Sequence, residues 1–120
     1  MAINLQSLRS AMHDKYGASG SEFDRLFIQA VNRVSVDLYT DVGISEDSIS
    51  QVTGELSVDA KYLSVYLKGV AMYLGQDRQW AKEPEEDAER KYRVALGQAK
   101  YMYAEDEGLK GGTSASSWGD

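Results

Sequence analysis

Residues 21–40 read SEFDRLFIQAVNRVSVDLYT, and this stretch decides the fold. Its apolar side chains recur at intervals of three and four residues, which places them on one face of an α-helix. They are Phe23, Leu26, Phe27, Ala30, Val31, Val34 and Leu38. Ser21 is expected to cap the first turn, where Glu22 and Asp24 also suit the positive end of the helix dipole. The pattern predicts a long helix with one face in a core.

A shorter helix is predicted before it, from Asn4 to Tyr16. Its apolar residues have the same spacing, and they are Leu5, Leu8, Met12 and Tyr16. Asn4 is a suitable N-cap, and Gly17 is suited to the left-handed backbone that ends many helices. Residues 17–20 are then a short connection to the long helix.

The segment 41–58 has no clear period. Its apolar residues are Ile44, Ile49, Val52, Leu56 and Val58. Residues 50–58 fit a short strand, a hairpin turning at Thr53 and Gly54, or a loop held by Ile49 and Val52. The spacing does not choose between these three.

A third helix is predicted from Asp59 to Gly75, with an extension to Trp80 as an alternative. Asp59 or Ser57 would cap it. Its expected buried face is Leu63, Leu67, Val70 and Leu74. Tyr62, Tyr66 and Tyr73 lie beside that face, and Gly69 leaves room for a close neighbour.

A fourth helix is predicted from Pro84 to Asp106, because proline suits the first helical turn. Its apolar face is Ala88, Tyr92, Ala95, Leu96, Ala99, Met102 and Tyr103. Gly108 is expected to end it and to begin a flexible Gly/Ser-rich tail. We therefore predict an all-α fold, a small bundle of about four helices. It comprises one domain over residues 1–107 and a tail over residues 108–120.

Composition excludes several functions. The 120 residues carry a net charge of −6 without a basic cluster, which argues against nucleic acid or an anionic membrane as the main ligand. Cysteine is absent, so disulfides and thiolate chemistry are excluded. We also expect no signal peptide and no membrane span.

Catalytic motifs are lacking as well. His13 is the only histidine, so a zinc-binding His-Glu-x-x-His cannot form. A serine triad would have to recruit His13, and the sequence has no nucleophile-elbow motif. An acidic cluster precedes and opens the fourth helix, where negative charge is favoured. It consists of Glu83, Glu85, Glu86, Asp87 and Glu89. An enzyme using this cluster with a divalent metal is the least favoured alternative. We therefore expect that the chain is not an enzyme and that it binds no cofactor and no metal.

Aromatic residues are the remaining clue to function. The chain has eight tyrosines and two tryptophans, and both residue types are enriched in protein–protein interfaces. The candidate interface residues are Tyr62, Tyr66, Tyr73, Tyr101, Leu109 and Trp118. Tyr101 points away from the apolar face of the predicted fourth helix, which makes it the more telling candidate. The alternative is that the other tyrosines simply lie at the edge of a single hydrophobic core and form no interface.

The layout of residues 21–107 resembles the head–tail connector (adaptor or head-completion) proteins of tailed bacteriophages. The resemblance is carried by the long helix at 21–34, the connection at 49–52, and the segments 56–63 and 66–74, followed by a last helix and a loose tail. It implies a homo-oligomeric ring of twelve copies in the virion neck, after synthesis in the host cytoplasm. The expected partners are the portal protein above and tail or stopper proteins below.

The resemblance brings no catalytic residues with it. It implies a channel through which DNA passes without specific binding, which suits an acidic chain. The other function consistent with these residues is a small helical regulator that binds one partner protein as a monomer or dimer.

Overall fold

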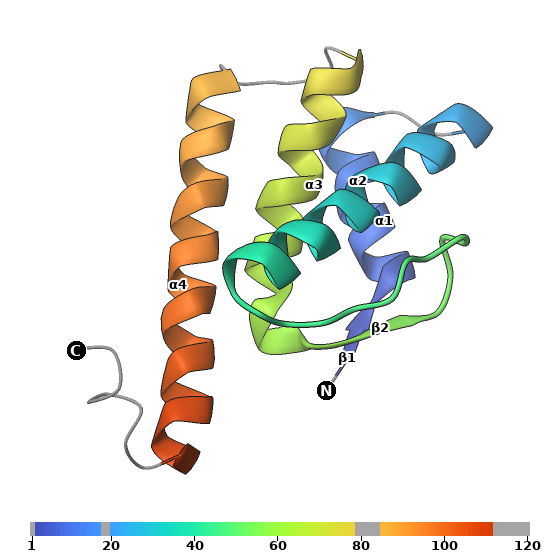
Figure 1. Ribbon diagram of the computed structural model, residues 1–120. Helices are drawn as coiled ribbons and strands as arrows, with labels where there is room; N and C mark the ends of the chain where they lie inside the picture. Colours follow the sequence, from blue (N-terminus) through green and yellow to red (C-terminus); the bar gives the residue numbers. More distant parts are fainter. Residues whose placement is uncertain (1, 18–19, 79–84, 112–120) are drawn as a thin grey trace.

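In the computed structural model, residues 2–17, 20–78 and 85–111 are described, with side chains at 2–17, 20–75 and 87–106. This part of the chain forms four α-helices, one 3-10 turn and a two-stranded sheet. Figure 1 shows α2 crossing in front of α3, with α1 on one side of α3 and α4 on the other. The prediction of a small helical bundle is confirmed.

The first helix, α1, spans Leu5–Tyr16, and both of its predicted ends are confirmed. The Asn4 side chain accepts a hydrogen bond from the Ser7 backbone N–H at 2.9 Å. Gly17 adopts the left-handed conformation at φ 64° and donates to the His13 carbonyl. Arg9 then ties α1 to α2 through an ion pair with Asp24 at 2.7 Å.

The second helix, α2, spans Ser21–Asp41, and its predicted apolar face is buried throughout. The predicted capping role of Ser21 is wrong. The N-cap is Gly20, at φ 106°, and no side chain caps the helix. This backbone conformation favours glycine over a residue with a side chain, so Ser21 becomes the first helical residue instead.

The sheet pairs the N-terminus with the segment whose structure the sequence left open. Strand β1, Ala2–Asn4, runs antiparallel to β2, Glu55–Asp59, with Ile3 opposite Leu56. A hairpin at Thr53 and Gly54 is therefore not formed, whereas the short strand is. Pairing with the distant N-terminus buries both Ile3 and Leu56, which a local hairpin would not do.

The loop before β2 is fixed by two polar side chains. Asn32 of α2 accepts from the Ile49 N–H at 2.8 Å and donates to the Ile49 carbonyl at 3.1 Å. Glu46 accepts from the Val58 N–H and from the Ser57 hydroxyl, both at 2.9 Å. These bonds satisfy backbone groups that a loop otherwise leaves to water.

The third helix, α3, spans Leu63–Arg78 after a 3-10 turn at Ala60–Tyr62. Asp59 caps this turn, as predicted, by accepting from the Lys61 N–H at 2.9 Å. The predicted buried face is partly wrong, because Leu63 and Leu67 are only half-buried. The helix packs against both α2 and α4, so its buried arc is broader and is rotated towards the tyrosines. The buried residues of this segment include Tyr62, Val65, Tyr66, Gly69, Val70, Met72 and Leu74.

The fourth helix, α4, spans Glu85–Gly111. Its predicted apolar face contacts the core, with Tyr92, Ala95, Leu96 and Ala99 fully buried. The prediction that Gly108 ends the helix is wrong, because α4 continues to Gly111. A glycine inside a helix costs only about 1 kcal/mol and does not by itself force an end. The predicted start at Pro84 lies outside the described residues, as do residues 112–120 of the predicted tail.

The core joins all four helices and the sheet. Within this core, Gly69 of α3 lies in close contact with α2 and α4. A methyl group at this position would lie 2.5 Å from a Tyr92 ring carbon and 2.6 Å from a Val34 methyl. The predicted role of Gly69 in close packing is thus confirmed. None of the described helices combines the length and apolar character needed to cross a membrane.

Candidate interaction surface

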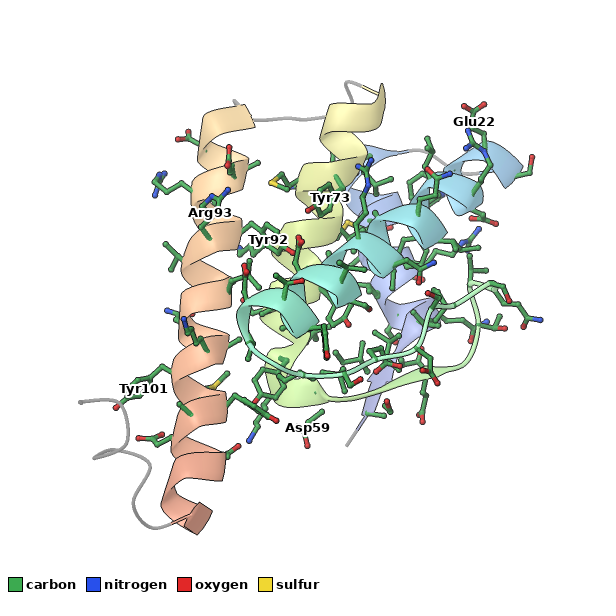
Figure 2. The ribbon with its side chains drawn as sticks, in the orientation of Figure 1. Glu22, Asp59, Tyr73, Tyr92, Arg93 and Tyr101 are labelled. Atoms are coloured by element: carbon green, nitrogen blue, oxygen red, sulfur yellow. The ribbon has the colours of Figure 1, made fainter. Side chains whose placement is uncertain are left out.

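Three helices meet at one half-buried carboxylate. Asp37 of α2 accepts hydrogen bonds from the phenols of Tyr73 on α3 and Tyr92 on α4, at 2.5 and 2.6 Å. The two rings meet edge to face, with centroids 5.9 Å apart, and the Arg33 guanidinium lies 5.1 Å from the Tyr73 ring centre. Figure 2 shows Tyr73 and Tyr92 together between these helices. This contact fixes α4 against the rest of the bundle.

The phenols of this cluster are donors and not bases. Burial, reinforced by the hydrogen bond to Asp37, raises the pKa of Tyr73 to about 12 and raises that of Tyr92 further. Burial also raises the pKa of Tyr66 to about 12, although its bond to the Ser35 hydroxyl at 2.8 Å acts in the opposite direction. All three therefore stay protonated at neutral pH, in structural roles.

A hollow of about 390 Å³ lies beside the cluster, lined in part by Asp37, Asp41, Tyr73, Glu89 and Arg93. Three of its polar residues have partners within the fold: Asp37 accepts from the two phenols, and Glu89 pairs with Arg93 at 3.0 Å. Among the described residues, no group of three or more histidine, aspartate or glutamate side chains could hold a metal ion.

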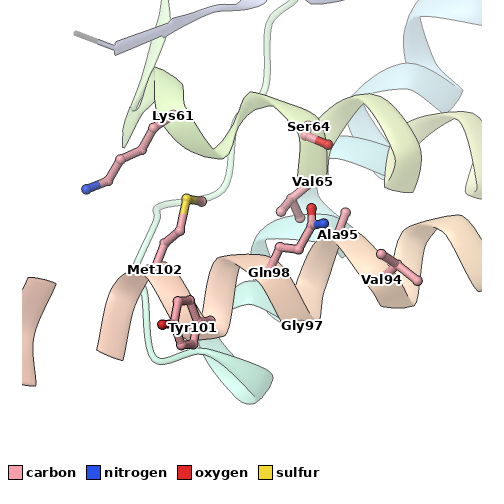
Figure 3. Close-up of a pocket in the computed structure, with 9 residues that line it drawn as sticks. All are labelled: Lys61, Ser64, Val65, Val94, Ala95, Gly97, Gln98, Tyr101 and Met102. Atoms are coloured by element: carbon pink, nitrogen blue, oxygen red, sulfur yellow. The ribbon is translucent and has the colours of Figure 1, made fainter. Parts of the chain in front are cut away.

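A larger and more apolar groove runs between α3 and α4 on the outside of the bundle (Figure 3). Its volume is about 640 Å³. It is lined by Lys61, Ser64, Val65, Val94, Ala95, Gly97, Gln98, Tyr101 and Met102. Val94 is 52% exposed and Tyr101 is 68% exposed, and both line this groove. We call this the α3–α4 groove.

A second exposed apolar pair lies on α2. Val36 and Tyr39 are each 63% exposed and are three residues apart, so they are neighbours on the helix surface. We call this pair the α2 ridge. Together with Val94 and Tyr101, these residues are the large hydrophobic side chains most exposed in the described part of the chain.

The six predicted interface residues have different positions. Tyr62 and Tyr66 are buried, so they belong to the core, the alternative that the sequence left open. Tyr73 is half-buried and hydrogen-bonded to Asp37. Tyr101 lies on the surface, as its position on the helix predicted, and Figure 2 shows it pointing outward.

The last two predicted interface residues are Leu109 and Trp118. Trp118 and the side chain of Leu109 lie outside the described residues. Sequence reasoning missed Val36, Tyr39 and Val94. All three are apolar residues off the buried face of an otherwise regular helix, and that departure is the pattern that would have identified them.

Comparison with models of known protein families, with curated protein sequences and with solved structures found no match to this chain.

Proposed function

We propose that this chain is a structural subunit of an assembly, and specifically a ring-forming connector between the portal and the tail of a tailed bacteriophage. One observation carries the proposal. The described surface has two separate apolar sites, the α2 ridge and the α3–α4 groove, on different helices. A subunit in a closed ring needs two different surfaces, one for each neighbour.

The ridge and the groove suit such contacts in shape as well as in chemistry. Val36 and Tyr39 project from a helix, whereas the groove is concave between two helices. Tyrosine supplies a large contact area at low conformational-entropy cost, which is why it is common at the centres of interfaces. A ridge on one copy against a groove on the next would repeat around a ring.

The charge distribution supports a channel through which DNA passes without being held. Several basic side chains are paired with acids within the fold: Arg9 with Asp24, Arg25 with Glu22, Arg90 with Asp87 and Arg93 with Glu89. A surface that grips phosphates needs clustered, unneutralised Lys and Arg. Pairing and a net charge of −6 both oppose that role.

The test is electron microscopy, with mass measurement, of the particle formed when the protein meets purified portal or portal-containing heads. A ring of this protein stacked coaxially on the portal is the expected result. Val36→Glu should prevent the ring, because it places a charge at the centre of the ridge. Ser10→Glu adds the same charge to the exposed surface of α1 and should leave the ring intact. A protein that never decorates the portal contradicts the proposal.

The second candidate is a helical regulator that binds one partner protein. The α3–α4 groove favours it, because a groove between two helices is a common site for an amphipathic helix. This function predicts binding to one protein with a small fixed stoichiometry, and no ring with any portal.

A further inference from the structure

The exposed face of α4 is self-complementary about its midpoint, between Gly97 and Gln98. Val94 and Tyr101 lie at equal distances on either side of this point, and Arg90 and Glu105 lie at equal distances further out. Successive members of this series are three or four residues apart, so they share one face of the helix. The face is thus basic at one end, acidic at the other and apolar between.

We propose that a second copy of this chain binds there, with the two α4 helices antiparallel. In this arrangement each Tyr101 ring contacts Val94 of the other copy, and each Arg90 faces Glu105 of the other copy. The spacing matches on both helices, because Val94 and Tyr101 are about 10 Å apart along either axis at a rise of ~1.5 Å per residue. The contact is two-fold, so the same surface of both copies takes part.

The groove provides room for this second helix. Gly97 lies at the centre of the exposed face, and a methyl group added there would meet no atom of the described residues within 4 Å. The neighbouring lining residues Ala95 and Ser64 are small. Lys61 is held by Asp106 at one end of the groove, and its ammonium lies 5.5 Å from the Tyr62 ring centre. A glycine at the crossing lets two helix backbones approach closely.

The charges favour a second copy over an unrelated apolar partner. Arg90 is exposed and pairs with Asp87 at 3.3 Å, while Glu105 is exposed near the other end of the face. An antiparallel partner helix would have to present acid, apolar residue, small residue, apolar residue and base in that order. The α4 helix itself presents this order when it is reversed.

This dimer does not rest on the ring proposed above. A two-fold contact joins only two copies and cannot close a larger ring. If the ring also forms, the dimer is the state of the free protein, and it must open before the groove receives a neighbour's α2 ridge.

The test is the mass of the full chain by light scattering over a range of concentrations. We expect a dimer that dissociates on dilution. Arg90→Glu and Glu105→Arg should each weaken it about tenfold, because each places like charges opposite one another twice per dimer. The double variant Arg90→Glu/Glu105→Arg exchanges the two charges and should restore the wild-type affinity. Circular dichroism of each variant checks that the fold is retained.

A second measurement locates the contact. Because the chain has no cysteine, Gln98→Cys places one thiol per copy beside the two-fold axis. Mild oxidation should link two such chains rapidly, whereas Val36→Cys, equally accessible on α2, should link slowly. A monomer at every concentration overturns the proposal. So does a dimer that all three charge variants leave unchanged, or one that links faster through residue 36. None of these outcomes depends on a portal, so failure here is distinguishable from failure of the ring.

Discussion

The two faces of α4 use the same residue type in opposite ways. On the inner face Tyr92 is 3% exposed, packs beside Gly69 and donates a hydrogen bond to Asp37. On the outer face Tyr101 is 68% exposed and lies in an open groove. The inner face is packed within one chain, whereas the outer face presents apolar surface that the described part of the chain leaves exposed.

Because of this difference, substitutions on the two faces of α4 should affect different properties, the stability of the fold and the binding of a partner. A change on the inner face alters the fold, because packed and hydrogen-bonded groups lose their partners. A change on the outer face should alter association while the fold persists. Matched substitutions on the two faces therefore test whether the outer face is a binding surface.

The largest effect is expected from Gly69→Ala on the α3 surface that meets Tyr92. The added methyl would lie within 2.6 Å of both Tyr92 and Val34, and these packed side chains cannot move apart without losing other contacts. We expect a loss of about 3 kcal/mol in the free energy of unfolding, at the upper end for overpacking. Urea denaturation measures it. A loss below about 0.5 kcal/mol, typical of surface sites, would show that the helices separate easily here.

A smaller loss is expected from Asp37→Ala. It removes the acceptor shared by Tyr73 and Tyr92, and the cost of leaving buried donors unpaired is about 2 kcal/mol. Asp37→Asn is the control, because its amide oxygen still accepts and should retain part of the stability. Equal losses for the two variants would mean that the negative charge matters, and not the acceptor.

Raising the pH from 10 to 11 should lower the free energy of unfolding by about 1 kcal/mol through Tyr66. Tyr66 has a pKa near 12 in the folded chain, above the value of about 10 in the unfolded chain. Its contribution is complete below pH 10 and is lost as the pH rises towards 12, since the unfolded chain loses the proton first. The slope is at most about 1.4 kcal/mol per pH unit for one retained proton.

Urea denaturation at several pH values between 10 and 12 measures this slope. Tyr66→Phe removes one of the three phenols whose pKa burial raises and should make the slope shallower. A slope that Tyr66→Phe leaves unchanged would assign the alkaline instability to other groups.

The helices could be predicted from the sequence because their patterns are local. The α2 face, the Asn4 and Asp59 caps and the Gly17 end all depend on residues within one or two turns. The pairing of β1 with β2 could not be predicted, because it joins residues more than fifty positions apart and neither strand has a strong period. The buried face of α3 could not be predicted correctly for a similar reason, because contacts with two other helices decide which of its residues are buried.

The interface was only partly predictable. A tyrosine count does not distinguish Tyr66, which the fold buries, from Tyr101, which it exposes. Helix position did identify Tyr101, because it lies off the apolar face of its own helix. The same reasoning applied to every apolar residue would have found Val36 and Val94. These residues are recognisable as the apolar side chains that lie outside the buried face of their own helix.

The smallest effect on the fold, and the most informative, is expected from Gly97→Ala on the outer face. It is the same substitution as at Gly69, on a helix surface where the new methyl meets none of the described residues within 4 Å. Alanine favours helix over glycine by up to about 1 kcal/mol, so the variant should be slightly more stable when measured at high dilution. At higher concentration the dimer adds its own stabilisation, and the methyl at the helix crossing should reduce that part. Wild type should therefore begin to gain stability at a lower protein concentration than the variant. The same onset concentration for both would mean that Gly97 faces solvent in the dimer, and the antiparallel α4 contact would then be wrong even if the protein is dimeric.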